Sequence, residues 1–311
     1  MKKKVYIDGQ SGTTGLQIYD RIGAREDLTL LRIDEDKRHD IEERKKFLNT
    51  ADIVFLCLPD DGAREAVSLI ENPEVRVIDA STAHRTDPGW VYGFPELSES
   101  QREAIRTGKR IANPGCHATG LISVTAPLVS MGILPKDYPV TCFSLTGYSG
   151  GGKKMIADYE GEDRAEKLSS PGIYGLTLKH KHVPEMTKMT GLTQAPVFLP
   201  VVDDYYKGMA STIMLQNRLL EGCPSADEIC AKLADYYKGQ RFVKVLPFEA
   251  ARPTIYANTL AGTNRLEIAV CGNDEQTTVT ALFDNLGKGA SGAAVQNMNI
   301  MLGLDEGIGL E

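Results

Sequence analysis

A single cysteine carries the clearest chemical signal in the sequence. Cys116 lies in the run Asn113-Pro114-Gly115-Cys116-His117, between a short β-prone stretch and an apolar, helix-compatible stretch, Ala118 to Met131. The preceding proline and glycine favour a sharp turn, which places the cysteine in the first turn of a helix. The positive end of a helix favours a thiolate, and a thiolate is a nucleophile. On position alone, a nucleophile and an ordinary packing cysteine are equally compatible with the sequence.

Two histidines in His180-Lys181-His182-Val183-Pro184-Glu185 are the second candidate group. In an extended segment their side chains point to opposite sides, so only one would face a given cysteine. This geometry argues against a His-x-His metal pair, and no metal site is expected. A neutral imidazole near Cys116 can take its proton and later act as acid or base. Without the cysteine, the pair is better interpreted as loop histidines.

Two basic segments are candidates for binding an anion. Arg85 ends the loop Ser81-Thr82-Ala83-His84-Arg85, which follows a predicted strand. It fits an anion clamp and a solvated surface arginine equally well. Residues Ser149 to Lys154 are predicted to form a flexible loop with consecutive glycines, Lys153 and Lys154, suited either to an anionic substrate or to mobility alone.

The first elements predict a dinucleotide site. A β-prone run, Lys4 to Asp8, leads into Gly9-Gln10-Ser11-Gly12-Thr13-Thr14-Gly15 and then a helical stretch, Leu16 to Ile22. The glycines allow a tight turn, close approach of a phosphate and close packing of helix on strand. The spacing is Gly-x-x-Gly-x-x-Gly rather than the commoner Gly-x-Gly-x-x-Gly. At the end of the second strand, Arg32, Lys37 and Arg38 favour NADP while Asp34 favours NAD, which leaves the choice open.

The elements around these residues alternate at first and then become strand-rich. Strand and helix patterns alternate as far as Asp79, which predicts a doubly wound parallel sheet, and Pro59 ends the apolar run Asp52 to Leu58 at the ligand edge. Strands dominate after the Cys116 helix, which predicts a mixed α+β domain. Ser225 and Glu228 form a capping box that opens a helix. The last predicted helix, Ala293 to Met301, is expected to pack on the first domain.

Composition limits the classes of function. The 311 residues are 42% apolar and 25% charged, with a net charge of -7, and the length suggests two domains. No basic run interleaved with aromatics suggests nucleic acid, and no stretch of about 18 apolar residues suggests a membrane span. The chain enters a strand directly after Met1. The six cysteines form no Cys-x-x-Cys pair and suit reduced thiols in the cytoplasm.

Taken together, these motifs resemble the short form of the N-acetyl-γ-glutamyl-phosphate reductases, in the aspartate-semialdehyde dehydrogenase superfamily. The resemblance covers nearly the whole chain, and the cysteine and histidine segments are its most specific parts. The segments that carry it are Gly9 to Gly15, Asp79 to Arg85, Tyr92-Gly93-Phe94-Pro95-Glu96-Leu97, Asn113 to His117, His180 to Glu185 and Asn285-Leu286-Gly287-Lys288-Gly289-Ala290.

The resemblance implies a fold and an assembly. It implies an α/β chain with a Rossmann-type NADP-binding domain over residues 1–115, completed by a C-terminal helix in residues 288–311. It also implies an α+β catalytic and dimerisation domain over residues 116–287, and a homodimer or homotetramer.

The resemblance also implies roles for residues. Cys116 would be the nucleophile and His182 the acid/base. Arg85, His180, Asn113 and Lys153 would contact substrate. The cofactor, expected to be NADPH, would be bound by Gly9, Ser11, Gly12, Thr13, Thr14, Gly15, Arg32, Pro59, Ser81 and Asn285.

The implied reaction is the NADPH-dependent reduction of N-acetyl-glutamyl 5-phosphate to the 5-semialdehyde, with release of phosphate, in arginine biosynthesis. Two alternatives stay open on the sequence. The same machinery can serve an aspartyl or aminoadipyl phosphate, and an NADP-binding redox sensor would need no turnover. A sensor has no use for an anion clamp or a base, which favours the enzyme.

Overall fold

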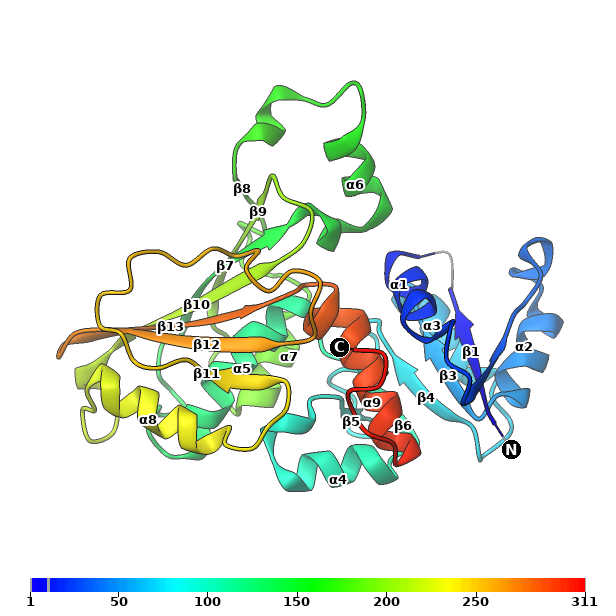
Figure 1. The fold of residues 1–311 in the computed structure, drawn as a ribbon, viewed down its shortest axis with the longest axis horizontal. Helices are drawn as coiled ribbons and strands as arrows, with labels where there is room; N and C mark the ends of the chain where they lie inside the picture. Colours follow the sequence, from blue (N-terminus) through cyan, green and yellow to red (C-terminus); the bar gives the residue numbers. More distant parts are fainter. Residues whose placement is uncertain (1, 10–11, 311) are drawn as a thin grey trace. The chain divides into compact units, whose positions relative to one another are not determined.

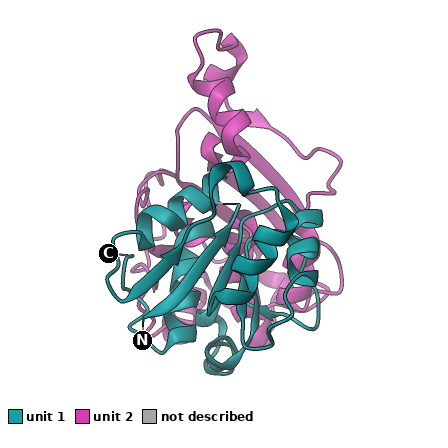
Figure 2. Cartoon of the chain, turned by 90° about the vertical axis from the view of Figure 1, so that its right-hand side faces the viewer, with its two compact units in different colours: residues 1–114, 290–311 teal, residues 115–289 magenta. Residues whose placement is uncertain are grey.

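The chain folds into two compact units, each built around its own sheet. The structure, a computed structural model, describes residues 2–9 and 12–310 (Figure 1). Unit 1 runs from the N-terminus to Pro114 and resumes at Ala290, and unit 2 comprises Gly115–Gly289 (Figure 2). Ser11, predicted to contact the cofactor, lies outside the described residues.

Unit 1 contains a parallel sheet in the order β2-β1-β3-β4-β6-β5. Consecutive strands are parallel, which requires a crossover connection between them. The helices that lie between successive strands in the chain provide these crossover connections. The strands are β1 (Lys3–Asp8), β2 (Leu28–Leu31), β3 (Ile53–Leu56), β4 (Arg76–Asp79), β5 (Val91–Tyr92) and β6 (Arg110–Ala112).

Helices of unit 1 form two packed groups, as expected for a doubly wound sheet. The helices α1 (Thr13–Ile22), α4 (Glu99–Thr107) and α9 (Gly292–Leu302) pack together, and α2 (Ile41–Thr50) packs with α3 (Asp60–Ser68). The central strand β3 is buried at every position, which explains its unbroken apolar sequence. Because neighbouring strands of this sheet are parallel, their carboxyl ends lie together at one edge of the sheet.

Unit 2 contains a mixed sheet in the order β11-β12-β13-β10-β7-β9-β8. The long strands β10 and β13 pair antiparallel, and β7 pairs with β10 so that Ser144 lies opposite Ser211. The strands are β7 (Thr141–Gly147), β8 (Gly172–Ile173), β9 (Val197–Asp203), β10 (Met209–Gln216), β11 (Val243–Val245), β12 (Leu266–Gly272) and β13 (Gln276–Phe283).

The helix that carries Cys116 is the centre of unit 2. Helix α5 (Cys116–Ser130) packs on β10 and β13, and α7 (Val183–Thr190) and α8 (Ala226–Tyr236) pack on α5. Nearly the whole of α5 is buried, and most of its residues are apolar or small. The predicted capping box is confirmed at the start of α8, where the backbone N–H of Ser225 donates to Glu228 at 2.9 Å.

The prediction of a flexible loop at Ser149 to Lys154 was wrong. Residues Tyr148–Gly151 form a 3-10 turn, and α6 (Gly152–Glu160) begins at the last glycine of the run. Gly152 has a φ of 74°, so a glycine is needed to join the two elements. The ring of Tyr159, buried on α6, stacks on Tyr148 at 4.6 Å between centroids and fixes the helix to the turn.

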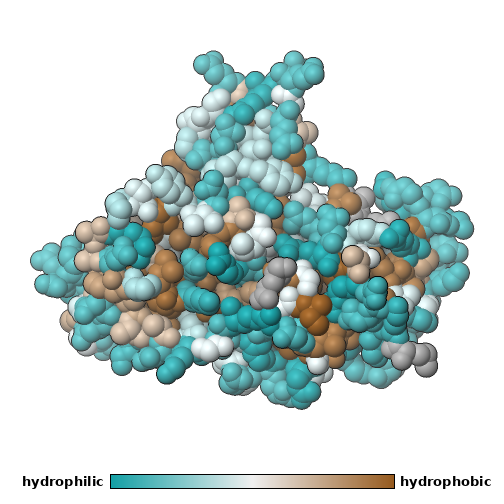
Figure 3. Space-filling model, viewed as in Figure 1, coloured by the Kyte–Doolittle hydropathy of each residue, from teal (hydrophilic) through white to brown (hydrophobic). Residues whose placement is uncertain are grey.

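The surface of the described residues is mainly hydrophilic in the view of Figure 3, with smaller apolar areas between the polar groups. Within residues 2–9 and 12–310, no helix combines the length and the apolar character needed to cross a bilayer. All six cysteines are free thiols.

Candidate active site

Cys116 is the first residue of α5, as the sequence predicts. Gly115 precedes the helix in an extended conformation, and its carbonyl accepts from the Thr119 backbone at 2.8 Å and from Thr119 Oγ1 at 3.1 Å. A Cβ on Gly289 would lie 3.0 Å from Cys116 Cβ, so the glycine leaves room beside the half-buried thiol. The amides of a first helical turn have no acceptor within the helix, and they point toward the helix start. The position suits a thiolate and an oxyanion next to it.

The two predicted histidines lie on the same side of the chain, which corrects the expectation of opposite sides. Lys181 and His182 form a turn that leads into α7, rather than an extended segment. As a result, the rings of His180 and His182 are 4.7 Å apart, and the backbone N–H of His182 donates to His180 Nδ1 at 3.2 Å. With Nδ1 as an acceptor, a neutral His180 carries its proton on Nε2 and can donate from there.

Sequence reasoning assigned no role to His117, yet this residue joins the same cluster. Its ring centroid lies 5.5 Å from that of His180 and 5.9 Å from that of His182. His117 is next to Cys116 in the sequence, so Cys116 and three imidazoles belong to one region of unit 2. Tyr174, which follows β8, is also part of this cluster, since its hydroxyl lies 2.7 Å from His117 Nε2. His117 could have been noticed from the sequence because it ends the cysteine motif, whereas Tyr174 belongs to no motif.

The glycine turn of unit 1 has the geometry of a phosphate cradle. Gly9 has a φ of 87°, and a Cβ there would lie 2.4 Å from the Cys57 carbonyl oxygen. Only glycine satisfies both conditions. Gly12 precedes α1 and donates its N–H to the Gly9 carbonyl at 3.0 Å, while Thr13 and Thr14 open α1 and Gly15 is buried within it. A helix N-terminus next to a close-approach turn is the arrangement that binds a pyrophosphate.

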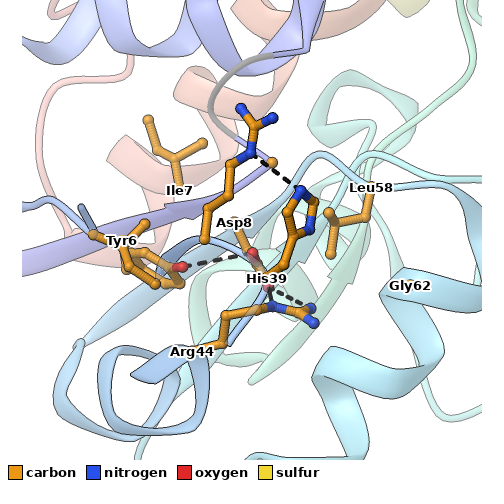
Figure 4. Close-up of a pocket in the computed structure, with 10 residues that line it drawn as sticks. Tyr6, Ile7, Asp8, His39, Arg44, Leu58 and Gly62 are labelled. Atoms are coloured by element: carbon orange, nitrogen blue, oxygen red, sulfur yellow. Dashed lines mark hydrogen bonds and ion pairs between the residues drawn. The ribbon is translucent and has the colours of Figure 1, made fainter. Parts of the chain in front are cut away.

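A pocket of about 310 Å³ adjoins this turn (Figure 4). At its wall, Arg44 donates to Asp8 at 3.0 and 3.3 Å and to Glu65 at 2.7 Å, so two carboxylates compensate its charge. Burial raises the pKa of Asp8, and Arg44 opposes that shift. The pocket is lined by Tyr6, Ile7, Asp8, Gly9, Ile33, Arg38, His39, Arg44, Leu58 and Gly62.

Arg32, which is expected from the sequence to contact the cofactor, does not line this pocket, and its contact stays a prediction. Arg32 is exposed, and its guanidinium lies 4.7 Å from the centre of the Tyr19 ring. It is not among the described residues that line the pocket, whereas Arg38 is. Arg38 pairs with Glu35 and donates to His39 at 3.2 Å. The end of the second strand offered Arg32, Lys37 and Arg38 as alternatives, and Arg32 was the expected contact; of the three, only Arg38 lines this pocket among the described residues.

Arg85 is buried and bound to backbone carbonyls of unit 1. Its Nε donates to the Asn113 carbonyl at 2.9 Å and its Nη2 donates to the Ala80 carbonyl at 3.0 Å. The Asn113 side chain in turn donates to the Ala290 carbonyl at 3.0 Å and accepts from Asn297 at 3.2 Å. These contacts fix the chain just before Gly115, and the roles of Arg85 and Asn113 toward substrate stay predictions.

Four further predicted residues lie in well-defined surroundings. Pro59 caps α3, and Ser81 binds the Asp79 carboxylate through its N–H at 2.9 Å and its hydroxyl at 2.8 Å. Asn285 accepts from the Gly208 N–H at 2.8 Å and donates to Ser149 at 3.0 Å, and Lys153 is exposed at the start of α6. Their ligand contacts stay predictions.

Comparisons with known proteins agree with the two-unit architecture. Family models match the "Semialdehyde dehydrogenase, NAD binding domain" over residues 14–107 and the "Semialdehyde dehydrogenase, dimerisation domain" over residues 116–285. Aspartate semialdehyde dehydrogenase II from Vibrio cholerae shares the fold, with a TM-score of 0.72 and 16% identity over 97% of this chain and 99% of that one. The Candida albicans enzyme with NADP has a TM-score of 0.68 at 15% identity, covering 97% and 99%. The two family models thus show that the chain is a semialdehyde dehydrogenase with an NAD-binding domain and a dimerisation domain.

Relatives with much higher sequence identity show which family of semialdehyde dehydrogenases the chain belongs to. The chain is 48% identical to N-acetyl-gamma-glutamyl-phosphate reductase 2 of a Nostoc species, over 99% of each chain. It is 50% identical to the Pseudomonas putida protein of the same name over 96% of each, and 50% identical to the Chelativorans reductase over 97% of this chain and 99% of that one. The chain belongs to the N-acetyl-gamma-glutamyl-phosphate reductase family.

Proposed function

We propose that this chain reduces N-acetyl-glutamyl 5-phosphate to N-acetyl-glutamate 5-semialdehyde with NADPH and releases phosphate, as a step of arginine biosynthesis. The names of the relatives support the substrate. The observation that carries the proposal is the position of Cys116 at the start of α5, in the same unit as His180 and His182. A nucleophile at a helix start, in the same unit as imidazoles that can act as acid or base, suits acyl transfer.

Cys116 carries the covalent chemistry in this scheme. Its thiolate attacks the carbonyl carbon of the acyl phosphate, the C–O bond to phosphate breaks, and a thioester forms on the sulfur. NADPH held by Gly9 and Gly12 at the start of α1 would supply the hydride that reduces this thioester. The C–S bond of the resulting hemithioacetal breaks, the aldehyde leaves, and Cys116 returns to the thiolate.

The two histidines have different roles in this scheme, one in proton transfer and one in substrate binding. His182, buried at the start of α7, serves as the acid/base that supplies a proton to the hemithioacetal oxygen and takes it back as the aldehyde forms. His180 donates to the substrate from Nε2, because its Nδ1 accepts the His182 backbone N–H. Arg85 and Lys153 serve the leaving phosphate.

Arg38 is the residue that distinguishes NADP from NAD. The pocket beside Gly9 contains two arginines, but Arg44 is buried and neutralised by Asp8 and Glu65. Arg38 is half-buried, and its partner Glu35 is exposed, so this ion pair is weak and easily exchanged for a phosphate. We therefore assign the contact with the 2′-phosphate to Arg38 rather than to Arg32.

The assembly is a homodimer or homotetramer in the cytoplasm. The match of residues 116–285 to a dimerisation domain supports the oligomer, and the free thiols suit a reducing compartment. Sedimentation velocity tests this assignment, and a monomer at assay concentration would contradict it.

A reverse assay tests the proposed function. N-acetyl-glutamate 5-semialdehyde, phosphate and NADP are combined with the protein, and formation of NADPH is followed by absorbance. Phosphate-dependent NADPH formation supports the proposal. Activity with aspartate semialdehyde instead would show that the substrate is an aspartyl phosphate. No activity with any aldehyde would favour a redox sensor.

A further inference from the structure

A buried carboxylate lies in the wall of the pocket beside the glycine turn of unit 1. Asp8 is the last residue of β1, directly precedes Gly9 and is 4% exposed. Among the described residues that line this pocket, Asp8 is the only one with a carboxylate (Figure 4). A carboxylate repels the phosphates that a glycine turn at a helix start binds. The position of Asp8 is therefore unfavourable for a dinucleotide unless its charge is compensated.

The backbone holds Asp8 in this position. Asp8 lies opposite Leu56 in the parallel pairing of β1 with β3, and its carbonyl accepts from the Cys57 N–H at 2.8 Å. Gly9, the next residue, lies so close to Cys57 that a Cβ on it would come within 2.4 Å of the Cys57 carbonyl oxygen. Any withdrawal of Asp8 from the pocket would break this pairing, so the carboxylate has to be tolerated where it is.

Arg44 of α2 supplies the compensating charge. Its Nη2 and Nε both donate to Asp8 Oδ2, at 3.0 and 3.3 Å, and its side chain is 9% exposed. Its Nη1 donates to Glu65 of α3 at 2.7 Å, but the Glu65 side chain is 47% exposed. Water screens an exposed carboxylate far more than a buried one. The charge of Arg44 therefore serves mainly the buried carboxylate of Asp8.

Tyr6 makes a weaker contact with the same carboxylate. Its hydroxyl lies 3.5 Å from Asp8 Oδ1, at the limit of a hydrogen bond, and it carries no positive charge. Figure 4 shows Tyr6 and Arg44 both linked to Asp8. The compensation of Asp8 thus depends on Arg44 rather than on Tyr6.

We propose that Arg44 is a positioning residue for the nicotinamide cofactor, which acts through Asp8 by neutralising its charge so that the pyrophosphate can lie at the Gly9 turn. The effect is common to NADPH and NADH, because both contain the pyrophosphate. It therefore differs from the role of Arg38, which concerns the 2′-phosphate of NADPH alone. No covalent bond forms or breaks. This inference rests on the proposed function only for the presence of a nicotinamide cofactor.

Cofactor binding to the full-length protein tests the inference without turnover. The dissociation constants of NADPH and NADH are measured by titration calorimetry for the wild type, Arg44→Met and Arg44→Lys. Arg44→Met leaves a buried, unpaired carboxylate in the pocket, so both dissociation constants should rise by a similar factor of roughly 10–100. Arg44→Lys keeps the charge and should stay within a few-fold of the wild type. Unchanged binding in Arg44→Met, or a loss confined to NADPH, would overturn the proposal.

A double variant shows whether Arg44 acts through the charge of Asp8. Asp8→Asn removes the carboxylate, so the combination of Asp8→Asn with Arg44→Met is expected to bind both cofactors within a few-fold of Asp8→Asn alone. This comparison remains decisive if Arg44→Met by itself does not fold, because neither of the two proteins contains an unpaired buried carboxylate. A further loss of affinity on adding Arg44→Met to Asp8→Asn would contradict a role through Asp8.

Glu65→Gln is the matched control. It removes the other carboxylate that Arg44 contacts and leaves the pair of Arg44 with Asp8 in place, so both dissociation constants should stay at or below the wild-type values. A loss equal to that of Arg44→Met would overturn the assignment to Asp8.

These binding readouts keep the inference separate from the proposed function. A wild-type protein that binds NADPH but reduces no acyl phosphate, with the expected losses in Arg44→Met, would reject the proposed function and retain the inference. An active reductase whose Arg44→Met variant binds both cofactors as tightly as the wild type would do the opposite.

Discussion

The backbone N–H of Gly115 donates to Glu185 Oε2 at 3.2 Å, and both residues are buried. Glu185 lies in the first turn of α7, and Gly115 immediately precedes Cys116, the proposed nucleophile. This single contact ties the helix that follows the histidine pair to the turn that presents Cys116. It explains why a glutamate ends the histidine motif of the sequence.

Replacing Glu185 therefore tests how the turn is held. Glu185→Ala removes the acceptor and leaves a buried N–H, which costs about 1–3 kcal/mol of stability, and we expect a loss of kcat on the order of 10-fold. Glu185→Gln retains an acceptor oxygen of similar reach and should keep most of the activity. The measurement is steady-state kinetics with thermal unfolding of both variants. Equal activity of the Ala variant and the wild type would show that the contact does not position Cys116.

The two histidines are expected to differ in importance. His182→Ala removes the acid/base and should lower kcat by about 10²–10⁴-fold. His180→Ala removes a donor to the substrate and should act mainly on KM. Both variants leave the neighbouring ring in place, so each serves as the control for the other. A larger fall in kcat for His180→Ala than for His182→Ala would reverse the assignment.

Cofactor preference is expected to depend on Arg38. Arg38→Ser removes the charge next to the pocket and should raise the KM for NADPH by roughly 10–100-fold, with little change in the KM for NADH. Arg32→Ser is the matched control, because Arg32 is an exposed arginine stacked on Tyr19. The kinetic constants are measured with both cofactors. A larger rise in the KM for NADPH in Arg32→Ser than in Arg38→Ser would instead support Arg32, the residue expected from the sequence.

Acid should destabilise the protein through His117. The folded-state pKa is about 3, whereas an unfolded histidine titrates near 6.5, so the unfolded chain binds more protons between these values. The free energy of unfolding therefore falls as the pH drops through this window, by up to about 1.4 kcal/mol per pH unit. The free energy of unfolding in urea, measured against pH, should fall less steeply for His117→Gln. Identical slopes for the variant and the wild type would argue that His117 remains accessible to protons.

The sequence predicted the parts of the fold that depend on local patterns. The apolar run that forms β3, the capping box of α8 and the position of Cys116 at the start of a helix all follow from neighbouring residue types. The glycine turn was predictable because Gly9 needs a backbone conformation that other residues rarely adopt. Each of these features is decided within a few residues.

Features that depend on long-range packing could not be predicted in the same way. The His180 and His182 rings meet because a turn precedes α7, a helix whose Pro184 and Glu185 are first-turn signals that the extended interpretation overlooked. Tyr174 joins the site from a segment 57 residues after His117, a contact with no local pattern. Which of Arg32, Lys37 and Arg38 lines the pocket beside Gly9 depends on how the chain turns after β2.

The central claim is that Cys116 forms a thioester, and mass spectrometry of the trapped enzyme tests it most directly. The acyl phosphate is generated in place from N-acetyl-glutamate and ATP by the kinase that makes it, with no NADPH present. The account predicts that the protein gains the mass of one N-acetyl-glutamyl group, located on the Cys116 peptide and absent from Cys116→Ala, while Cys271→Ala behaves as the wild type. Full turnover by Cys116→Ala, or acylation at another residue, would contradict the account.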